Sequence, residues 1–468
     1  MIDGLRPYAE MKPSRLPWLG EVPAHWDIRR IKTLLREVDS RSKTGEERLL
    51  SLRMRQGLID HIDAGGKLIP PESLVNFKIV EPGQVVMNRM RAAVGLFGVA
   101  SVRGLVSPDY AVFEPKPEAF NPYLLQAFRL PSLSAVFRAE SKGLGTGESG
   151  FLRLYTDRFG PIPVPYPPLD EQRSIVRFLD WHGAQTAKLI RAKKKIIALL
   201  NEQKQAIIHR AVTRGLDPNV RLKPSGIPWL GDVPEGWEVL PCRALFAEVR
   251  EREAPQEELL SVTIRNGVIP QKQLLENSSK KDSSNLDKTK YKLVLPGDIA
   301  YNKMRAWQGA FGASAYRGII SPAYVVQRPR AGALSQYYHY LLRTPSFAKE
   351  AEKWSYGIVS DMWSLRPEHF RLIYCPKPPE AEQKAICEHL EIATRDIVCA
   401  IHTVEREIAL IQEFRTRLTA DAVIGKLDVR AASASLPDTA EPEAIGDLTE
   451  DDDLESPVDD VEDEEVAA

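Results

Sequence analysis

The sequence predicts an α+β fold in which two α/β units lie in tandem and each is followed by a long α-helix. We expect the two helices to pair as an antiparallel coiled coil with pseudo-two-fold symmetry. Two observations carry this prediction. Several motifs recur in the same order with a period of about 211 residues, which is typical of a duplicated unit. Each copy also contains a proline-free stretch, at residues 169–216 and 380–428.

Both proline-free stretches have apolar residues at alternating steps of three and four, which is the spacing of paired helices and not of strands. In the first stretch the apolar seam is incomplete and consists of Ile175, Leu179, Leu189, Ile196, Leu200 and Ile207. In the second stretch nine of ten seam positions from Ile386 to Leu418 are apolar. A helix of roughly 45 residues is about 65–70 Å long. We therefore expect two rods that hold the α/β units apart.

Charge is distributed unevenly along the chain of 468 residues. It contains 63 Lys and Arg and 64 Asp and Glu, for a net charge of −1. Residues 431–468 hold 15 of the acidic residues and none of the basic ones, so residues 1–430 carry a net charge of +14. A basic body is expected to attract a polyanion. We expect residues 429–468, which lack aromatic residues, to be a disordered acidic tail.

The first repeated motif opens each unit and contains two tryptophans. PSRLPWLGEVPAHW from Pro13 and PSGIPWLGDVPEGW from Pro224 are identical at nine of fourteen positions. The prolines favour an extended chain over a helix. We interpret the tryptophans as anchors onto the core of each unit, and base stacking as the alternative.

The second repeated motif is LLSLRMRQGLI, from Leu49, and its partner LLSVTIRNGVI, from Leu259. Each is expected to form a short strand that turns at a glycine. Arg55 and Arg265 precede these turns. They are candidates for contact with a base or a phosphate, and simple exposure to solvent is the alternative.

The densest match pairs residues 83–115 with residues 297–329, at 15 identities in 33 positions. Both copies contain the polar cluster N-[RK]-M-R within predicted twisted strands. Its candidate DNA-binding residues are Asn88, Arg89, Arg91, Asn302, Lys303 and Arg305. Such side chains suit phosphates and guanine edges. An internal network of ion pairs and turn contacts is the structural alternative.

Several catalytic and targeting motifs are missing from the sequence. SPDY and SPAY, which begin at Ser107 and Ser321, lack the first Asn or Asp and the second proline of the methyltransferase tetrapeptide. The glycine-rich stretch at residues 142–150 does not end in the Gly-Lys-Ser/Thr of a P-loop. The four cysteines have no CxxC spacing. We expect a cytoplasmic protein, because no apolar run approaches the roughly 20 residues of a membrane span.

Together, in duplicate and in this order, the motifs resemble the specificity subunit of type I restriction–modification systems over residues 12–428. The resemblance is carried by PWLGEVPAHW and PWLGDVPEGW, by NRMRAAVGLFG and NKMRAWQGAFG, and by PPLDEQRSIVRFLD and PPEAEQKAICEHLE. It implies target-recognition domains at 1–168 and 224–379, spacer helices at 169–216 and 380–428, a linker at 217–223 and an acidic tail at 429–468.

The resemblance further implies a non-catalytic subunit that binds a bipartite DNA target through two domains held at fixed spacing. Double-stranded DNA, two methylase subunits and, where the system cleaves DNA, a restriction/translocase subunit are the implied partners. Adenine N6 methylation and cleavage would occur on those partners. No cofactor is implied on this chain, because S-adenosylmethionine, ATP and Mg belong to the partner subunits. The residues alone leave two alternatives, a half-active methyltransferase or nuclease and a structural protein whose helices bind partners without DNA.

Overall fold

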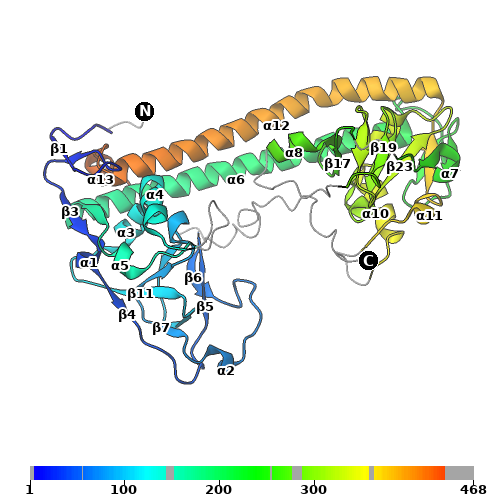
Figure 1. Cartoon of the computed structure of the whole chain (residues 1–468). Helices are drawn as coiled ribbons and strands as arrows, with labels where there is room; N and C mark the ends of the chain where they lie inside the picture. Colours follow the sequence, from blue (N-terminus) through cyan, green and yellow to red (C-terminus); the bar gives the residue numbers. More distant parts are fainter. Residues whose placement is uncertain are drawn as a thin grey trace. The chain divides into compact units, whose positions relative to one another are not determined.

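The computed structural model describes residues 5–54, 56–143, 152–252, 256–276, 287–357 and 363–437. These residues form two compact units (Figure 1). Among the described residues, unit 1 holds 5–192 and 407–437, and unit 2 holds 193–406. Each unit therefore combines one α/β domain with parts of both long helices, α6 (Leu169–Arg214) and α12 (Glu380–Val423).

The α/β domain of unit 1 is built on a four-stranded antiparallel sheet with the order β4-β11-β8-β9. These strands are β4 (Leu35–Val38), β11 (Tyr110–Pro115), β8 (Val85–Asn88) and β9 (Phe97–Val99). Four two-stranded pairs surround the sheet: β1 (Met11–Pro13) with β2 (Glu21–Pro23), β3 (Asp27–Arg30) with β12 (Pro163–Tyr166), β5 (Leu50–Arg53) with β6 (Gly57–Asp60), and β7 (Lys78–Val80) with β10 (Gly104–Val106). The helices of the domain are α1 (Ile31–Leu34), α2 (Pro71–Leu74), η1 (Ala92–Val94), α3 (Asn121–Phe128), α4 (Pro131–Glu140) and α5 (Thr156–Phe159).

Unit 2 repeats this topology, which confirms the predicted duplication of the fold. Its four-stranded sheet has the order β16-β23-β20-β21, with β16 (Phe246–Val249), β23 (Tyr324–Pro329), β20 (Ile299–Asn302) and β21 (Phe311–Ala313). The pairs are β13 (Leu222–Pro224) with β14 (Asp232–Pro234), β15 (Glu238–Pro241) with β24 (Tyr374–Lys377), β17 (Leu260–Thr263) with β18 (Gly267–Pro270), and β19 (Lys292–Val294) with β22 (Gly318–Ile320). Its helices are α7 (Cys242–Leu245), α8 (Gln271–Glu276), η2 (Ala306–Gln308), α9 (Ser335–Leu341), α10 (Pro345–Lys353) and α11 (Pro367–Phe370).

Each four-stranded sheet is covered on both faces. Side chains alternate between the faces of a strand, and here both sets are apolar. In unit 1, Val85 and Met87 belong to the core that contains α3, α4 and α5. Val86 belongs to a second core, which it shares with Leu52 and Leu58 of the β5–β6 hairpin. The sheet therefore fixes the hairpin on one side and the helices on the other.

Both long helices begin at the predicted residues because a Pro-Pro pair precedes them and acidic residues occupy the first turn. A buried glutamine then fastens each start. Gln172 Nε2 donates to the carbonyl of Pro167 at 2.8 Å, and Gln383 Nε2 donates to that of Pro378 at 2.8 Å. The Glu-Gln dipeptide of the motif is thus a structural anchor, since a buried amide needs its partners.

The end of each long helix packs into the α/β domain of the opposite half of the sequence. In unit 1 the hydroxyl of Tyr123 donates to the carbonyl of Val423 at 3.0 Å, and Trp26 is fully buried. In unit 2 the hydroxyl of Tyr337 donates to the carbonyl of Val212 at 2.7 Å, and Trp237 is 1% exposed. The tryptophans therefore anchor the core, as interpreted from the sequence.

The long helices share a core at both ends, and the order of their residues there is antiparallel. In unit 1 the start of α6, at Ile175 and Leu179, shares a core with Leu418 of α12. In unit 2 the end of α6, at Ile208, shares a core with Leu390. Between these ends the predicted seam is partly buried, because Ile397 is only 9% exposed whereas Leu189, Ile196 and Phe414 are 47%, 45% and 48% exposed. A straight helix drifts by about 20° per heptad from a 3.5-residue repeat, so one seam does not stay on one face.

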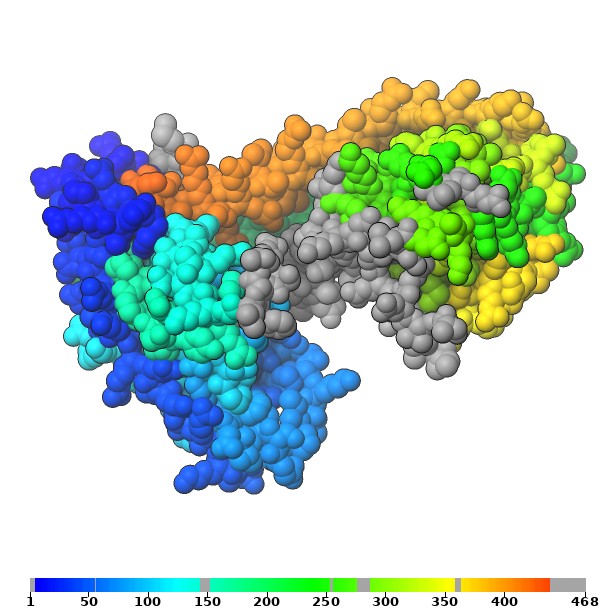
Figure 2. All heavy atoms as spheres, viewed as in Figure 1, coloured from blue at the N-terminus to red at the C-terminus, as the bar shows by residue number. Residues whose placement is uncertain are grey.

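The acidic tail begins later than predicted. Residues 430–434 form α13 (Arg430–Ala434), and Val429 and Ala432 are buried in the core of unit 1. The backbone N–H of Asp428 donates to the carbonyl of Arg6 at 2.8 Å, and Figure 2 shows the N-terminal segment against the end of α12 and α13. The prediction of disorder from residue 429 is therefore wrong for 429–437, because apolar side chains there reach a core. Residues 438–468 lie outside the described residues.

Candidate nucleic-acid interface

The N-[RK]-M-R motif forms a tight turn at the end of a central strand in each unit. Asn88 ends β8, Asn302 ends β20, and both are only 7% exposed. Asn88 Oδ1 accepts the backbone N–H groups of Met90 at 3.0 Å and Arg91 at 3.2 Å. Asn302 Oδ1 accepts that of Met304 at 2.9 Å. Asparagine commonly closes turns in this way. The contacts of both asparagines are thus those of turn-forming residues, which was the structural alternative.

The second position of the motif differs between the units. Arg89 Nη2 donates to Glu37 Oε1 at 2.8 Å, so its charge is neutralised inside unit 1. Lys303 is half-buried and forms no ion pair with another described residue. It lines a pocket of about 560 Å³ together with Tyr356 and Arg366. Lys303 is therefore the more available cation of the two for an anionic ligand.

The fourth position carries an arginine in both units. Arg91 is exposed and makes no ion pair within the described part of the chain. Arg305 is half-buried, and its Nη1 donates to Gln308 Oε1 at 3.2 Å. An exposed guanidinium can donate in pairs to a phosphate or to a guanine edge. Arg91 keeps that capacity in unit 1, and contact with DNA stays a prediction for both residues.

The β17–β18 hairpin presents Arg265 at its turn, where the side chain is exposed and unpaired with any described carboxylate. Arg343, just after α9, forms hydrogen bonds with the backbone of this turn. Its Nη2 donates to the carbonyl of Ile264 at 2.8 Å and to that of Arg265 at 2.5 Å. Gly267 completes the turn at a φ of +70°, a conformation that favours glycine. The corresponding candidate in unit 1, Arg55, lies outside the described residues.

His339, which is neutral at pH 7, lies beside Arg343. His339 Nε2 lies 2.8 Å from Arg343 Nη1, and its Nδ1 lies 3.2 Å from the backbone nitrogen of Ala313. A neutral imidazole has one acceptor nitrogen, so it accepts from one of these two donors and not from both. Burial, and after it the Arg343 charge, lower the pKa of His339 to about 4. The neutral ring can therefore pack against a cation without repulsion.

Sequence reasoning missed Arg343, although the repeat contained a signal for it. The corresponding residue of unit 1 is Arg129, whose Nη2 donates to the carbonyl of Phe97 at 3.2 Å. Burial lowers the pKa of Arg129 and of Arg343. An arginine retained at one position of two divergent copies was the available sign of a shared structural role.

A buried lysine in each unit was also missed. Lys78 and Lys292 are only 2% and 9% exposed. Lys292 Nζ donates to the carbonyl oxygens of Pro322, at 2.9 Å, and Tyr324. Burial, and after it the charge of Lys303, lower the pKa of Lys292 to about 8. The SPAY motif is therefore a turn held by a lysine, with contacts that are structural.

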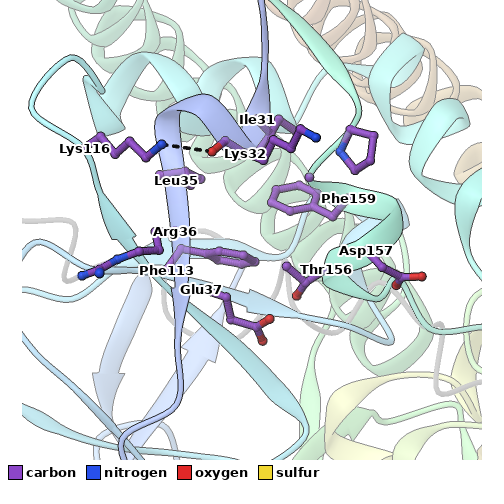
Figure 3. Close-up of a pocket in the computed structure, with 12 residues that line it drawn as sticks. Ile31, Lys32, Leu35, Arg36, Glu37, Phe113, Lys116, Thr156, Asp157 and Phe159 are labelled. Carbon is purple, nitrogen blue, oxygen red and sulfur yellow. Dashed lines mark hydrogen bonds between the residues drawn. The ribbon is translucent and has the colours of Figure 1, made fainter.

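Unit 1 also has a pocket of about 430 Å³ between β4, β11 and α5, shown in Figure 3. Its apolar lining includes Leu35, Phe113 and Phe159, and charged residues line it as well, among them Lys32 and Asp157. Lys116 Nζ donates to the carbonyl of Lys32 at 3.3 Å across one edge. No predicted contact residue lines this pocket within the described chain, so we keep it apart from the candidate interface.

The described residues contain neither a metal-binding group of side chains nor a helix suited to span a membrane. No group of three or more His, Cys, Asp or Glu side chains among them is placed to hold a metal. None of the described helices has both the length and the apolar character needed to cross a membrane. Most of the glycine-rich stretch at 142–150 lies outside the described residues. The candidate interface thus rests on the described turns that carry Arg91, Lys303 and Arg265.

A family model matches the chain at residues 72–199, and it is described as the type I restriction modification DNA specificity domain. The matched range includes the N-[RK]-M-R turn of unit 1 and the first part of α6. It therefore joins an α/β domain to a long helix.

Two proteins of Methanocaldococcus jannaschii are similar in sequence. The type I restriction enzyme MjaVIII specificity subunit is 25% identical over 344 residues, which is 70% of this chain and 75% of that protein. The putative type I restriction enzyme MjaX specificity subunit is 23% identical over 236 residues, which is 47% of this chain and 53% of that protein.

One solved structure shares the fold. That structure is described in connection with the complex assembly and conformational transition of the type I R-M system. The two chains superpose with a TM-score of 0.60 at 14% identity, over 86% of this chain and 99% of that chain.

Proposed function

We propose, on the premise that this chain belongs to the family of type I restriction–modification specificity subunits, that it selects the DNA target of such a system. Each α/β domain would recognise one part of a bipartite sequence, and the paired helices would set the distance between the parts. The chain itself would be non-catalytic. It would direct adenine N6 methylation and DNA cleavage by partner subunits.

The observation that carries this proposal is the exchange of helix ends between the two repeats. Each α/β domain packs against the end of the other repeat's helix, at Val423 in unit 1 and at Val212 in unit 2. Protein two-fold symmetry suits DNA because a duplex has two-fold axes of its own. Two similar but unequal domains are therefore expected to recognise two related but unequal half-sites.

The proposed partners are double-stranded DNA, two methylase subunits and, in a system that cleaves DNA, a restriction/translocase subunit. S-adenosylmethionine, ATP and Mg would be bound by these partners in the cytoplasm. The cations that support DNA contact are Arg91 in unit 1 and Lys303 and Arg265 in unit 2, which lack a described carboxylate partner. Unneutralised basic side chains favour phosphate binding, and that contribution weakens with salt.

The proposal is tested by co-expressing the chain with its methylase subunit and mapping modified adenines by sequencing that detects modified bases. We expect one bipartite motif with two specified parts and an unspecified gap. A matched variant replaces residues 224–379 with residues 13–168, and its motif should become symmetric while the gap stays the same. A continuous motif, or methylation without a sequence preference, would contradict the proposal.

A second test separates DNA contact from turn formation. Charge reversal by Arg91→Glu should weaken DNA binding and leave thermal stability unchanged, because the side chain is exposed. Asn88→Ala should lower stability by about 1–3 kcal/mol, the usual cost of leaving buried N–H groups without a partner. Binding by titration and melting by circular dichroism measure the two effects. Loss of stability in Arg91→Glu with unchanged DNA binding would favour the structural alternative.

A further inference from the structure

The pocket beside the N-[RK]-M-R turn of unit 2, which we call the Lys303 pocket, has a volume of about 560 Å³. Its polar lining comes from three segments: Lys303 in the turn, Tyr356 after α10, and Ser364, Arg366 and Glu368 around the start of α11. The cavity therefore gathers two cations, two hydroxyl groups and one carboxylate.

Backbone hydrogen bonds join the three segments that line the Lys303 pocket. The N–H of Leu365 donates to the carbonyl of Lys303 at 2.9 Å, so Arg366 is one residue away from a direct contact with the turn. The N–H of Ser364 donates to the carbonyl of Tyr356 at 3.1 Å. Leu365 is fully buried in the core of unit 2. The two cations are therefore brought to one cavity by contacts between the backbone segments that carry them.

Both cations of the Lys303 pocket are available to a ligand. Lys303 is half-buried, Arg366 is exposed, and neither forms an ion pair with a described carboxylate. Glu368 is the one carboxylate among the lining residues, so two positive charges and one negative charge leave the lining at +1. Ammonium, guanidinium and hydroxyl donors in one cavity fit an anion with several acceptor oxygens, and phosphate is such an anion.

The corresponding corner of unit 1 is differently built. Arg89 corresponds to Lys303, and its Nη2 donates to Glu37 Oε1 at 2.8 Å. Its guanidinium carbon also lies 6.0 Å from the ring centroid of Tyr155, which corresponds to Arg366. Unit 1 thus has a neutralised arginine and a tyrosine where unit 2 has two cations that lack a described carboxylate partner.

The carboxylate of the unit 1 ion pair is retained in unit 2 and has another partner there. Glu248 corresponds to Glu37, and its Oε1 lies 2.7 Å from Nε of Arg250. The residue of unit 1 that corresponds to Arg250 is Asp39, which cannot pair with a carboxylate in this way. The difference between Asp39 and Arg250 therefore leaves Lys303 without the carboxylate that neutralises the arginine of unit 1.

We propose that Lys303 and Arg366 bind one backbone phosphate of DNA in the Lys303 pocket, with the hydroxyl groups of Tyr356 and Ser364 as further donors. This inference rests on the proposed function and deepens it, because it assigns to unit 2 a phosphate site that the described residues of unit 1 do not form. Two cations on one phosphate fix the position of a domain on the duplex without reading its sequence. The two domains would then hold their parts of the target with unequal electrostatic contributions.

The test measures the salt dependence of DNA binding by the full chain with its methylase subunit. The probe is a duplex of random sequence, in 50 to 300 mM KCl. One phosphate contact contributes about −0.9 to the slope of log K against log salt. The double variant Lys303→Gln with Arg366→Gln should lose about 0.9 of that slope, so its affinity should fall roughly fivefold less over this range than that of the unmodified complex. Each single variant should lose part of this amount, because both cations bind the same phosphate.

The carboxylate of the pocket provides a variant with the opposite expected sign. Glu368→Gln removes the negative charge from the lining and should strengthen DNA binding about two- to fivefold at the lowest salt. Lys303→Arg and Arg366→Lys keep the positive charge and should keep the slope. The matched control is Arg243→Gln, which removes an exposed cation of unit 2 that lies on α7 and does not line the pocket. It should leave the slope unchanged.

An unchanged slope in the double variant, a loss of about 1.8 that would correspond to two separate phosphates, or an equal loss in Arg243→Gln would overturn the shared phosphate site. Weaker DNA binding by Glu368→Gln would also contradict it. Thermal melting with inorganic phosphate distinguishes DNA from a free ion as the source of the phosphate. Stabilisation by phosphate that is lost in Lys303→Gln, with DNA binding equal to that of the unmodified complex, would show that the pocket holds a free ion. Failure of the unmodified complex to bind any duplex would instead overturn the proposed function itself.

Discussion

Asn88 and Arg91 are three residues apart in one turn and lie in opposite environments. Asn88 is buried and accepts two backbone N–H groups, whereas Arg91 is exposed without an ion pair to a described residue. The sequence predicted a polar, basic turn here and could not separate the two roles. Burial is decided by where β8 ends, and side-chain composition does not reveal that position to within one residue.

His339 is expected to make the stability of unit 2 sensitive to mild acid. Its pKa of about 4 lies below the ordinary histidine value of about 6.5, because burial and then Arg343 disfavour the charged ring. The folded state therefore binds this proton less readily than the unfolded state. The stabilisation is complete above about pH 6.5 and is lost as the pH falls towards 4. The loss between pH 7 and pH 5 should be about 2 kcal/mol.

Urea denaturation at pH 7 and pH 5 measures this dependence. His339→Gln removes the titrating group and should flatten the difference between the two pH values. His389→Gln changes an exposed histidine on α12 of the same unit and should keep the difference of the unmodified chain. A His339→Gln variant with the full acid loss would show that other groups carry the effect.

At the scale of the helices, a single glycine just after α12 allows the chain to pack closely against the rest of unit 1. Gly425 has a φ of +78°, and a Cβ there would lie 2.4 Å from Pro23 Cδ and 2.9 Å from the Trp26 ring. Gly425→Ala should destabilise unit 1 by about 3 kcal/mol or more, because a left-handed backbone cost of about 1–2 kcal/mol adds to the steric clash. Tryptophan fluorescence during urea unfolding measures the loss.

The matched control is Gly20→Ala in the same unit. Gly20 has a φ of +71°, and nothing lies within 4 Å of an added Cβ. Only the backbone cost of about 1–2 kcal/mol should therefore be seen. Equal losses of stability in the two variants would mean that the end of α12 shifts to accommodate the added methyl group without a steric cost.

The start of each long helix could be predicted from the sequence and the docking of its end could not. Two prolines followed by acidic residues mark a helix start locally, and the buried Gln172 follows the same local pattern. The contact between Tyr123 and Val423 joins positions 300 residues apart, and one sequence contains no sign of such a pairing. The contact of Arg343 with the β17–β18 turn was hidden for the same reason.

For the whole chain, the exchange of helix ends means that neither repeat is a complete structural unit. Unit 1 needs Leu418 and Val423 from the second repeat, and unit 2 needs Ile208 and Val212 from the first. The duplication could be recognised in the sequence because its motifs recur at a fixed period. The exchange follows from packing, since each α/β domain leaves an apolar surface beside its buried tryptophan that its own helix alone does not cover.

The length of the paired helices should therefore set the gap between the two parts of a bipartite DNA target. Seven residues added after Ala198 and seven after Ala400 lengthen both helices by about 10.5 Å and keep their apolar faces nearly in phase. This length corresponds to about three base pairs at roughly 3.4 Å each. The preferred gap should lengthen by up to that amount while the half-site sequences stay unchanged, as measured by binding to duplexes with graded gaps.

Seven residues added to the linker between Asp217 and Lys223 lengthen neither helix and should leave the gap as it was. Altered half-site sequences at an unchanged gap would show that the helices do not determine the spacing.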